Sequence, residues 1–138
     1  MPTGTDLIRA DHKRVNALFE EFAETNDATL VGQIIDALTA HDQAEHAALY
    51  PLAGATLGDP ELLRSYEAAH MLVKRQIDAL RSTEDAALVE AVEVLRALVT
   101  EHVQDEEQNL LPALDEAATP DQLQGLAARI EQNKQRVG

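Results

Sequence analysis

The chain contains no cysteine and no tryptophan among its 138 residues, and aromatic residues make up only 3% of it. Without cysteine, the chain can form no disulfide and offers no thiolate as a nucleophile or metal ligand. So few aromatic side chains make a base-stacking platform for nucleic acid improbable. No run of about 18 apolar residues occurs, so we expect no membrane-spanning helix. The first residues lack a signal-peptide pattern, and together with the missing cysteines this predicts a cytoplasmic protein.

Basic residues are also scarce. The chain has 11 lysines and arginines against 25 aspartates and glutamates, which gives a formal net charge of −14. A nucleic-acid-binding protein needs a cationic surface, and the sequence shows no basic cluster. We therefore expect no nucleic-acid partner and no membrane partner, and the sequence indicates nothing about protein partners.

Apolar residues recur at helical spacing in four long segments and one short one, and none alternates like a strand. The expected helices are about 6–24, 29–50, from Asp59-Pro60 onward, and from a capping box at Ser82 to Pro112. Pro51 and Gly54 are expected to end the second. The sequence thus predicts a single all-α domain over 1–138. Its core is an up-down-up-down four-helix bundle of about 5–115, with a short fifth helix at about 119–136.

Each of the four long segments places one histidine inside its apolar stripe. A lone histidine on an apolar face is usually a satisfied core residue, but four helices that all do the same suggest a shared site. The fifth histidine, His46, lies off the stripes and is expected to be exposed. The four stripe histidines are His12, His41, His70 and His102.

Two glutamates extend this pattern. Glu45 follows His41 by four residues, and Glu106 follows His102 by four, so each pair lies one turn apart on the same helix face. Two unpaired carboxylates in a core are strongly disfavoured, and a bound cation would neutralise them. The second pair repeats the first at an offset of 61 residues, and a proline follows each glutamate by six. Such paired halves predict a site for two metal ions, with iron favoured over manganese or zinc.

The order His, His-x-x-x-Glu, His, His-x-x-x-Glu resembles that of the hemerythrin-like HHE cation-binding family, over about residues 5–115. The segments that run from Glu45 to Pro51 and from Glu106 to Pro112 are similar to that family's motif endings. The resemblance implies an oxo- or hydroxo-bridged centre of two iron ions in a hemerythrin-like fold. It also implies a ligand set of His12, His41, His70 and His102, with Glu45 and Glu106 bridging the two ions.

The chain departs from the oxygen-carrying members of that family. They have a further histidine one turn after the third ligand, where this chain has Lys74, and an aspartate in place of Glu106. The chain is therefore closer to the subgroup with four histidines and two glutamates. Both ions would then have an exchangeable position, which favours chemistry with hydrogen peroxide or nitric oxide over reversible carriage of dioxygen.

Three further side chains are weighed as additional ligands or close neighbours of the site. Tyr50 precedes Pro51, where some hemerythrin-like proteins place a tyrosine that reaches the iron, and Tyr66 lies one turn before His70. For both tyrosines the simpler expectation is a core side chain whose hydroxyl bonds a neighbour. Lys74 either leaves the site open or points away from it. Glu107, next to Glu106, is expected to be solvated.

Three functions remain open at this point. The favoured one is a di-iron protein that reacts with hydrogen peroxide, nitric oxide or dioxygen during oxidative stress, with catalase-like turnover as a possible enzymatic activity. The second is a non-catalytic module that binds, stores or senses dioxygen or iron. The third is a helical bundle whose histidines are structural or bind zinc. The sequence names no catalytic residue and no cofactor besides the metal.

Overall fold

The computed structural model describes residues 2–137, and it is helical throughout apart from short connections, with no strand in that range. The elements in chain order are α1 (Gly4–Thr25), α2 (Thr29–Ala44), η1 (Glu45–Leu49), α3 (Tyr50–Leu57), α4 (Pro60–Arg81), α5 (Ala86–Asp105), η2 (Glu106–Leu110), α6 (Leu111–Ala117) and α7 (Pro120–Val137). The two η elements are single π-helical turns that join α2 to α3 and α5 to α6 without a break.

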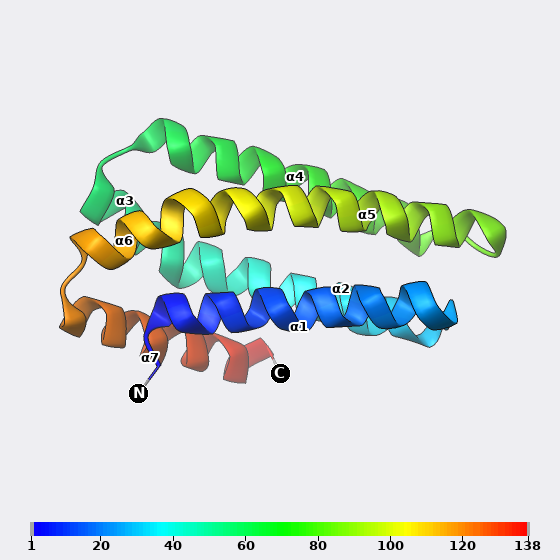
Figure 1. Cartoon of the computed structure of the whole chain (residues 1–138), viewed down its shortest axis with the longest axis horizontal. Helices are drawn as coiled ribbons and strands as arrows, with labels where there is room; N and C mark the ends of the chain where they lie inside the picture. Colours follow the sequence, from blue (N-terminus) through cyan, green and yellow to red (C-terminus); the bar gives the residue numbers. More distant parts are fainter. Residues whose placement is uncertain (1, 138) are drawn as a thin grey trace.

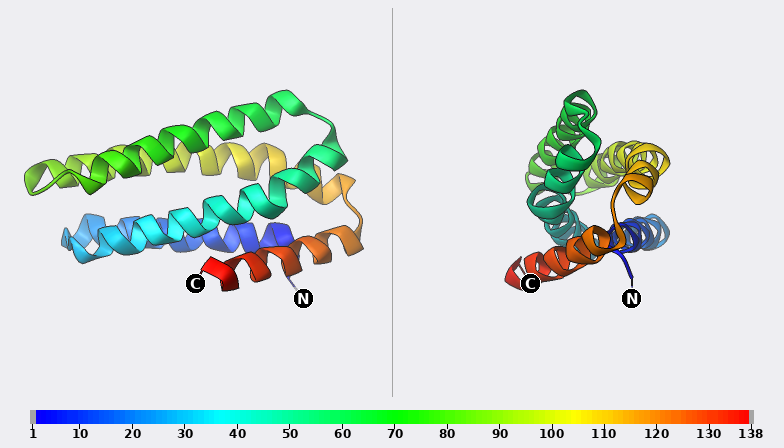
Figure 2. Two further views of the ribbon diagram at one scale, coloured as in Figure 1. Left: turned by 180° about the vertical axis from the view of Figure 1, so that it is seen from behind. Right: turned by 90° about the vertical axis from the view of Figure 1, so that its left-hand side faces the viewer.

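The long helices form an up-down-up-down bundle, as predicted (Figure 1). Helices α1 and α2 make one antiparallel pair, and α4 and α5 make the other. Seen along the bundle, the four helices occupy four corners, and α7 crosses beneath the α1–α2 pair (Figure 2). None of the helices in residues 2–137 has an apolar stretch long enough to cross a membrane.

Local signals set several helix starts. Thr3 caps α1 in a capping box with Asp6, and the Asp59 side chain accepts a hydrogen bond from the Leu62 amide at the start of α4. The expected capping box at Ser82 is wrong. The Ser82 hydroxyl donates to the carbonyl of Ala79 in the preceding helix, and α5 begins only at Ala86.

Neither proline ends its helix, which corrects a second expectation. The chain stays helical through Pro51 to Leu57 and through Pro112 to Ala117. Both prolines lie in the first turn of an α-helix that follows a π turn. Proline is tolerated in the first turn of an α-helix, and here the widened π turn leads directly into that turn.

The core consists of two apolar clusters with the histidines between them. One cluster gathers Ile8, Leu49, Leu111 and their neighbours at the α3–α6–α7 end. The other gathers side chains of α1, α2, α4 and α5 at the opposite end, including Phe19 and Leu95. Because each histidine lies between stripe residues of both clusters, the polar side chains are enclosed at mid-bundle.

Helix α7 packs on the outside of α1, α2 and η1. Its Leu126 and Ile130 side chains are fully buried, each worth about 1.5–3 kcal/mol of folding free energy. Gly4 permits this close approach, because a Cβ there would lie 2.2 Å from Leu126 Cγ. The fifth helix is therefore an integral part of the fold.

Candidate metal centre

The structure brings all six residues of the predicted ligand set together. Their side-chain atoms form two groups, in each of which the candidate donor atoms lie within 4.8 Å of one another. The first group takes one histidine from α1 and one from α2, and the second takes one from α4 and one from α5. Both groups share the glutamates that begin η1 and η2. The groups are His12, His41, Glu45, Glu106 and Glu45, His70, His102, Glu106.

The shared carboxylates lie at the centre, and neither has any exposed surface. Glu45 Oε1 lies 3.3 Å from His41 Nε2 and 3.0 Å from His70 Nε2. Glu106 lies 3.2 Å from the Nε2 atoms of both His12 and His102, through different oxygens. Every histidine therefore presents the same nitrogen, Nε2, towards the two carboxylates.

Four of these buried atoms have no hydrogen-bond partner in the described part of the chain. They are Nε2 of His12, Nε2 of His41, Oε2 of Glu45 and Oε1 of Glu106. Buried polar atoms normally find a partner, because leaving one unpaired costs about 1–3 kcal/mol. Neutral imidazole nitrogens and carboxylate oxygens are the donors that iron, zinc and manganese accept in helical bundles. The residues present therefore fit a metal.

A π turn begins at each of the two glutamates. The amide five residues later donates to the glutamate's carbonyl oxygen. Such turns appear mostly as single widened turns inside α-helices, frequently at functional sites. In η1 the widened turn also brings Tyr50, five residues after Glu45, onto the same face.

Tyr50 points into the centre. Its hydroxyl lies 3.0 Å from Glu106 Oε2, 3.3 Å from Glu45 Oε1 and 2.7 Å from His70 Nε2. Burial and the two nearby carboxylates raise the pKa of Tyr50 far above its ordinary value. The hydroxyl therefore keeps its proton and can donate it to either carboxylate.

Tyr66 fills core space and does not join the centre. Its ring stacks on Tyr50 with centroids 6.1 Å apart and meets His102 edge-on. Its hydroxyl donates to the backbone carbonyl and the side chain of Asp105, as expected for a core tyrosine with a bonded hydroxyl. Tyr66 thus supports the position of Tyr50 and His102 by packing.

The outer nitrogens of three histidines face carboxylates. His12 Nδ1 lies 2.5 Å from Glu107 Oε2, His41 Nδ1 lies 3.2 Å from Asp11 Oδ2, and His70 Nδ1 contacts Asp42 Oδ1. A carboxylate at Nδ1 fixes the tautomer that leaves Nε2 free as a donor to a metal. His102 is the exception, because its buried Nδ1 has no partner among residues 2–137.

These contacts correct one expectation and add two residues. Glu107 was expected to be solvated only, but its side chain, which remains 36% exposed, also contacts His12. Asp11 and Asp42 were not predicted. Each adjoins one histidine in sequence but contacts a different one on another helix, so adjacency alone gives no signal. Asp11 precedes His12 and bonds His41, and Asp42 follows His41 and bonds His70.

Two other side chains remain outside the centre. His46 is exposed, as expected, and its ring lies 4.9 Å from that of His70. Lys74 is exposed on α4 and lines a cavity of about 260 Å³ that also reaches His41, His70 and His102. The structure shows no bond from Lys74 to the six central residues.

The side chains of the centre bring opposite charges together. Burial by itself would lower the pKa of His102, but the Glu106 and Glu45 carboxylates outweigh burial and raise this pKa to about 9. The pKa of His41 is likewise raised, against its burial, chiefly by Glu45. Burial disfavours the charged form of Glu45, yet His41 and the surrounding hydrogen bonds lower its pKa well below the ordinary value. Protons thus take the place that a cation would take.

The comparisons with known proteins agree with this geometry. The family described as the hemerythrin HHE cation binding domain matches residues 3–114. A crystal structure of a hemerythrin HHE cation binding domain-containing protein from Mycobacterium kansasii superposes with a TM-score of 0.84. It shares 22% identity, and the match covers 99% of this chain and 90% of that one.

Two curated relatives match nearly the whole chain. A "DNA nickase" of Nostoc sp. is 30% identical over 96% of this chain, although the chain spans only 39% of that protein's length. An uncharacterized hemerythrin-like protein of Schizosaccharomyces pombe is 23% identical, with 96% of this chain and 70% of the relative covered. The family match, the shared fold and the buried histidine–glutamate cluster lead to one conclusion: the chain belongs to the hemerythrin HHE cation-binding domain family.

Proposed function

We propose that this chain is a di-iron domain that reacts with small oxygen and nitrogen species. The observation that carries the proposal is the pair of fully buried carboxylates shared by two histidine groups. In this assignment His12 and His41 would hold one ion, and His70 and His102 would hold the other. Glu45 and Glu106, which both groups share, would serve as ligands to both.

Iron is the metal we propose because imidazole and carboxylate donors in a helical bundle suit it, whereas thiolate ligands are missing from the chain. The Nε2 nitrogens and carboxylate oxygens that lack a hydrogen-bond partner are ligand atoms of the kind that iron accepts, which supports this choice. Zinc or manganese would fit the same donors less specifically. The carboxylates' negative charge would be neutralised by the ions, as the protonated histidines neutralise it without them.

Bound iron would supply redox chemistry and positions where a small molecule can bind. Two histidines and two shared carboxylates leave each ion short of a full set of protein ligands. Lys74 stands where oxygen carriers have a further histidine, and it is exposed. The Tyr50 hydroxyl holds a proton beside both carboxylates and can donate it as a hydrogen bond within the centre. We therefore propose hydrogen peroxide, nitric oxide or dioxygen as reactants, with catalase-like turnover.

The cavity beside Lys74 supports small reactants. Its lining combines apolar side chains such as Val73 and Val99 with charged ones such as Lys74 and Asp78, and it reaches three histidines of the centre. Its volume of about 260 Å³ suits a few water-sized molecules.

Peroxide consumption by the iron-loaded protein tests this function. We expect oxygen release from hydrogen peroxide that disappears after iron removal and returns on reloading. Val99→Phe should narrow the cavity and slow turnover without changing iron content. The control is Val94→Phe at an exposed position of the same helix, which should leave the rate of turnover unchanged. Turnover that is indifferent to iron removal would contradict the proposal.

A binding or sensing module is the second candidate, and the Nostoc relative favours it. This chain spans 39% of that protein, so a domain of this kind occurs within a longer protein there. The relative's printed name concerns DNA, but the net charge of −14 disfavours direct contact with phosphates. We propose that this chain does not bind DNA and works in the cytoplasm. A gel shift of duplex DNA at low salt would contradict the first statement.

A further inference from the structure

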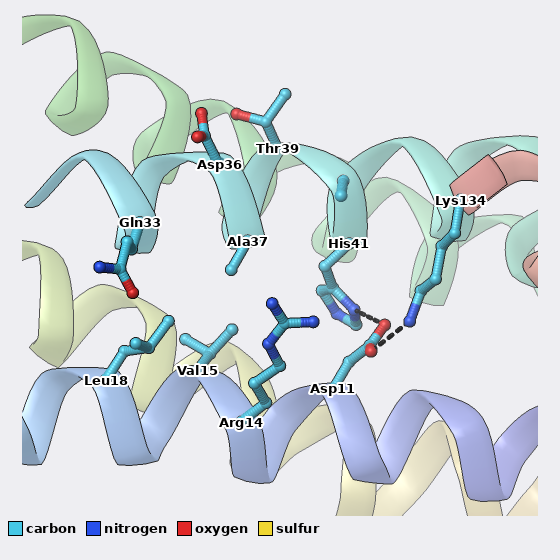
Figure 3. A pocket seen from close by; sticks show the side chains of 11 residues that line it. Asp11, Arg14, Val15, Leu18, Gln33, Asp36, Ala37, Thr39, His41 and Lys134 are labelled. Atoms are coloured by element: carbon cyan, nitrogen blue, oxygen red, sulfur yellow. Dashed lines mark hydrogen bonds and ion pairs between the residues drawn. The ribbon is translucent and has the colours of Figure 1, made fainter. Parts of the chain in front are cut away.

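Helix α7 lies beyond residues 3–114, which match the family, yet its C-terminal part contacts a carboxylate next to the candidate centre. Lys134, near the end of α7, forms an ion pair with Asp11 Oδ1. The other oxygen of the same carboxylate, Oδ2, lies 3.2 Å from His41 Nδ1. Figure 3 shows the Asp11 carboxylate between the His41 ring and the Lys134 amine.

Each oxygen of Asp11 therefore has its own partner. The Asp11 side chain is only 13% exposed, so an oxygen that loses its partner has little water to replace it. Lys134 thus prevents the carboxylate from rotating away from His41. The resulting chain of contacts runs from α7 through α1 to the α2 histidine at the centre.

The second half of the bundle provides an internal comparison. His70 follows His12 by 58 residues, and the same offset places Ala69 at the position of Asp11. The histidine that corresponds to His41 is His102, and its buried Nδ1 has no partner among the described residues. Ala69 and His102 instead line a cavity of about 170 Å³.

The two halves also differ in what covers them. Helix α7 packs against α1, α2 and η1, and it lies on the side of the bundle away from α4 and α5 (Figure 2). Among the described residues, a carboxylate contacts Nδ1 of the α2 histidine, in the half that α7 covers, but none contacts Nδ1 of the α5 histidine. The asymmetry therefore coincides with the presence of this helix.

We propose that Lys134 is a positioning residue of the metal centre. It holds the Asp11 carboxylate against His41 Nδ1, so that α7 controls how firmly the His12–His41 side retains its ion. The proposal rests on the metal-binding function proposed above. The carboxylate keeps Nε2 of His41 as the metal donor and increases its basicity, and losing such a partner typically weakens metal binding about 10- to 100-fold.

The first test measures the rate at which a chelator removes iron from the loaded protein. Lys134→Met keeps the stem but removes the charge, and we expect iron loss to accelerate about tenfold. Lys134→Arg should restore the slow rate. Arg129→Met removes the same charge from an exposed position of the same helix and should leave the rate unchanged. Equal rates for the two methionine variants would overturn the proposal.

A double-mutant cycle separates positioning from a general effect on α7. If Lys134 acts through Asp11, Lys134→Met should have no further effect on iron loss once Asp11→Ala is present. Additive effects of the two substitutions would contradict the proposed route. A lower melting temperature with an unchanged rate of iron loss would show that Lys134 only stabilises the fold.

A last measurement needs no metal, so it keeps the two proposals distinguishable. In metal-free protein, the ¹⁵N and ¹H signals of the His41 ring report its hydrogen bond to Asp11. We expect these signals to shift in Lys134→Met but not in Arg129→Met. A protein that binds no metal but shows this shift would refute the metal-binding function alone. Unshifted signals would refute the role of Lys134.

Discussion

Removing the metal is expected to reverse the pH dependence of folding stability. In metal-free protein the pKa of His102 is raised from 6.5 to about 9 by Glu106 and Glu45, against the effect of burial. A raised pKa in the folded state contributes stability that is complete below about pH 6.5 and is lost as the pH rises through about 9. A shift of this size corresponds to roughly 3 kcal/mol, counted once for the histidine and its carboxylates together.

The metal-loaded protein should behave in the opposite way. A histidine must be neutral to bind a metal, so metal binding depresses its apparent pKa in the folded state. Stability should then be lost as the pH falls below about 6.5, where the unfolded histidines take up protons.

Urea unfolding followed by circular dichroism checks both signs between about pH 6 and pH 9.5. We expect the unfolding free energy of metal-free protein to fall across this range, and that of metal-loaded protein to hold or rise. His46→Ala is the control, because His46 is exposed and outside the central groups; it should leave both trends intact. A metal-free protein that becomes more stable towards pH 9 would refute the reasoning.

Four substitutions test individual side chains. His41→Ala and His102→Ala should each lose bound metal and also lower the unfolding free energy by about 3–5 kcal/mol. The reason is that two buried carboxylates would keep less positive charge beside them. Iron analysis and thermal melts that match those of His46→Ala would exclude both histidines as ligands. Tyr50→Phe removes a hydroxyl that contacts both glutamates. It should lower the unfolding free energy of the metal-free protein by about 1–3 kcal/mol and alter the optical spectrum of the metal-loaded protein. An unchanged spectrum and an unchanged melting temperature would show that the hydroxyl does not serve the centre. Protein that is reduced without oxygen and then exposed to air should form no long-lived, reversible dioxygen adduct, as judged by its optical spectrum. Lys74→His should lengthen the lifetime of such an adduct. A stable, reversible adduct in the unsubstituted protein would contradict the assignment of an open site.

The sequence predicted the bundle and the central residues because both depend on helical periodicity. His12, His41, His70 and His102 lie on apolar stripes, so folding the stripes together places them together. Glu45 and Glu106 follow from the same rule, one turn after a histidine. A short-range rule suffices for these residues because a regular helix fixes their direction.

The contacts around the histidines depend on the packing of one helix against another, which periodicity does not specify. Asp11 adjoins His12 in sequence but bonds His41, since α1 faces α2 at this level. Glu107 was expected in solvent, but it lies in η2 beside α1 and reaches His12. The same widened turns place Pro51 and Pro112 in a first helical turn, which is why neither ends its helix.

Metal analysis of the purified protein tests the central claim most directly. The two groups that share Glu45 and Glu106 predict two metal ions per chain, and the donor set predicts iron after expression in iron-replete medium. Iron should be measured by elemental analysis against protein concentration from amino-acid analysis, with Glu45→Gln as the matched variant that should lose metal. Close to two irons per chain, lost in that variant, is the result we expect. One ion per chain at saturation, or zinc as the sole metal, would contradict the di-iron centre.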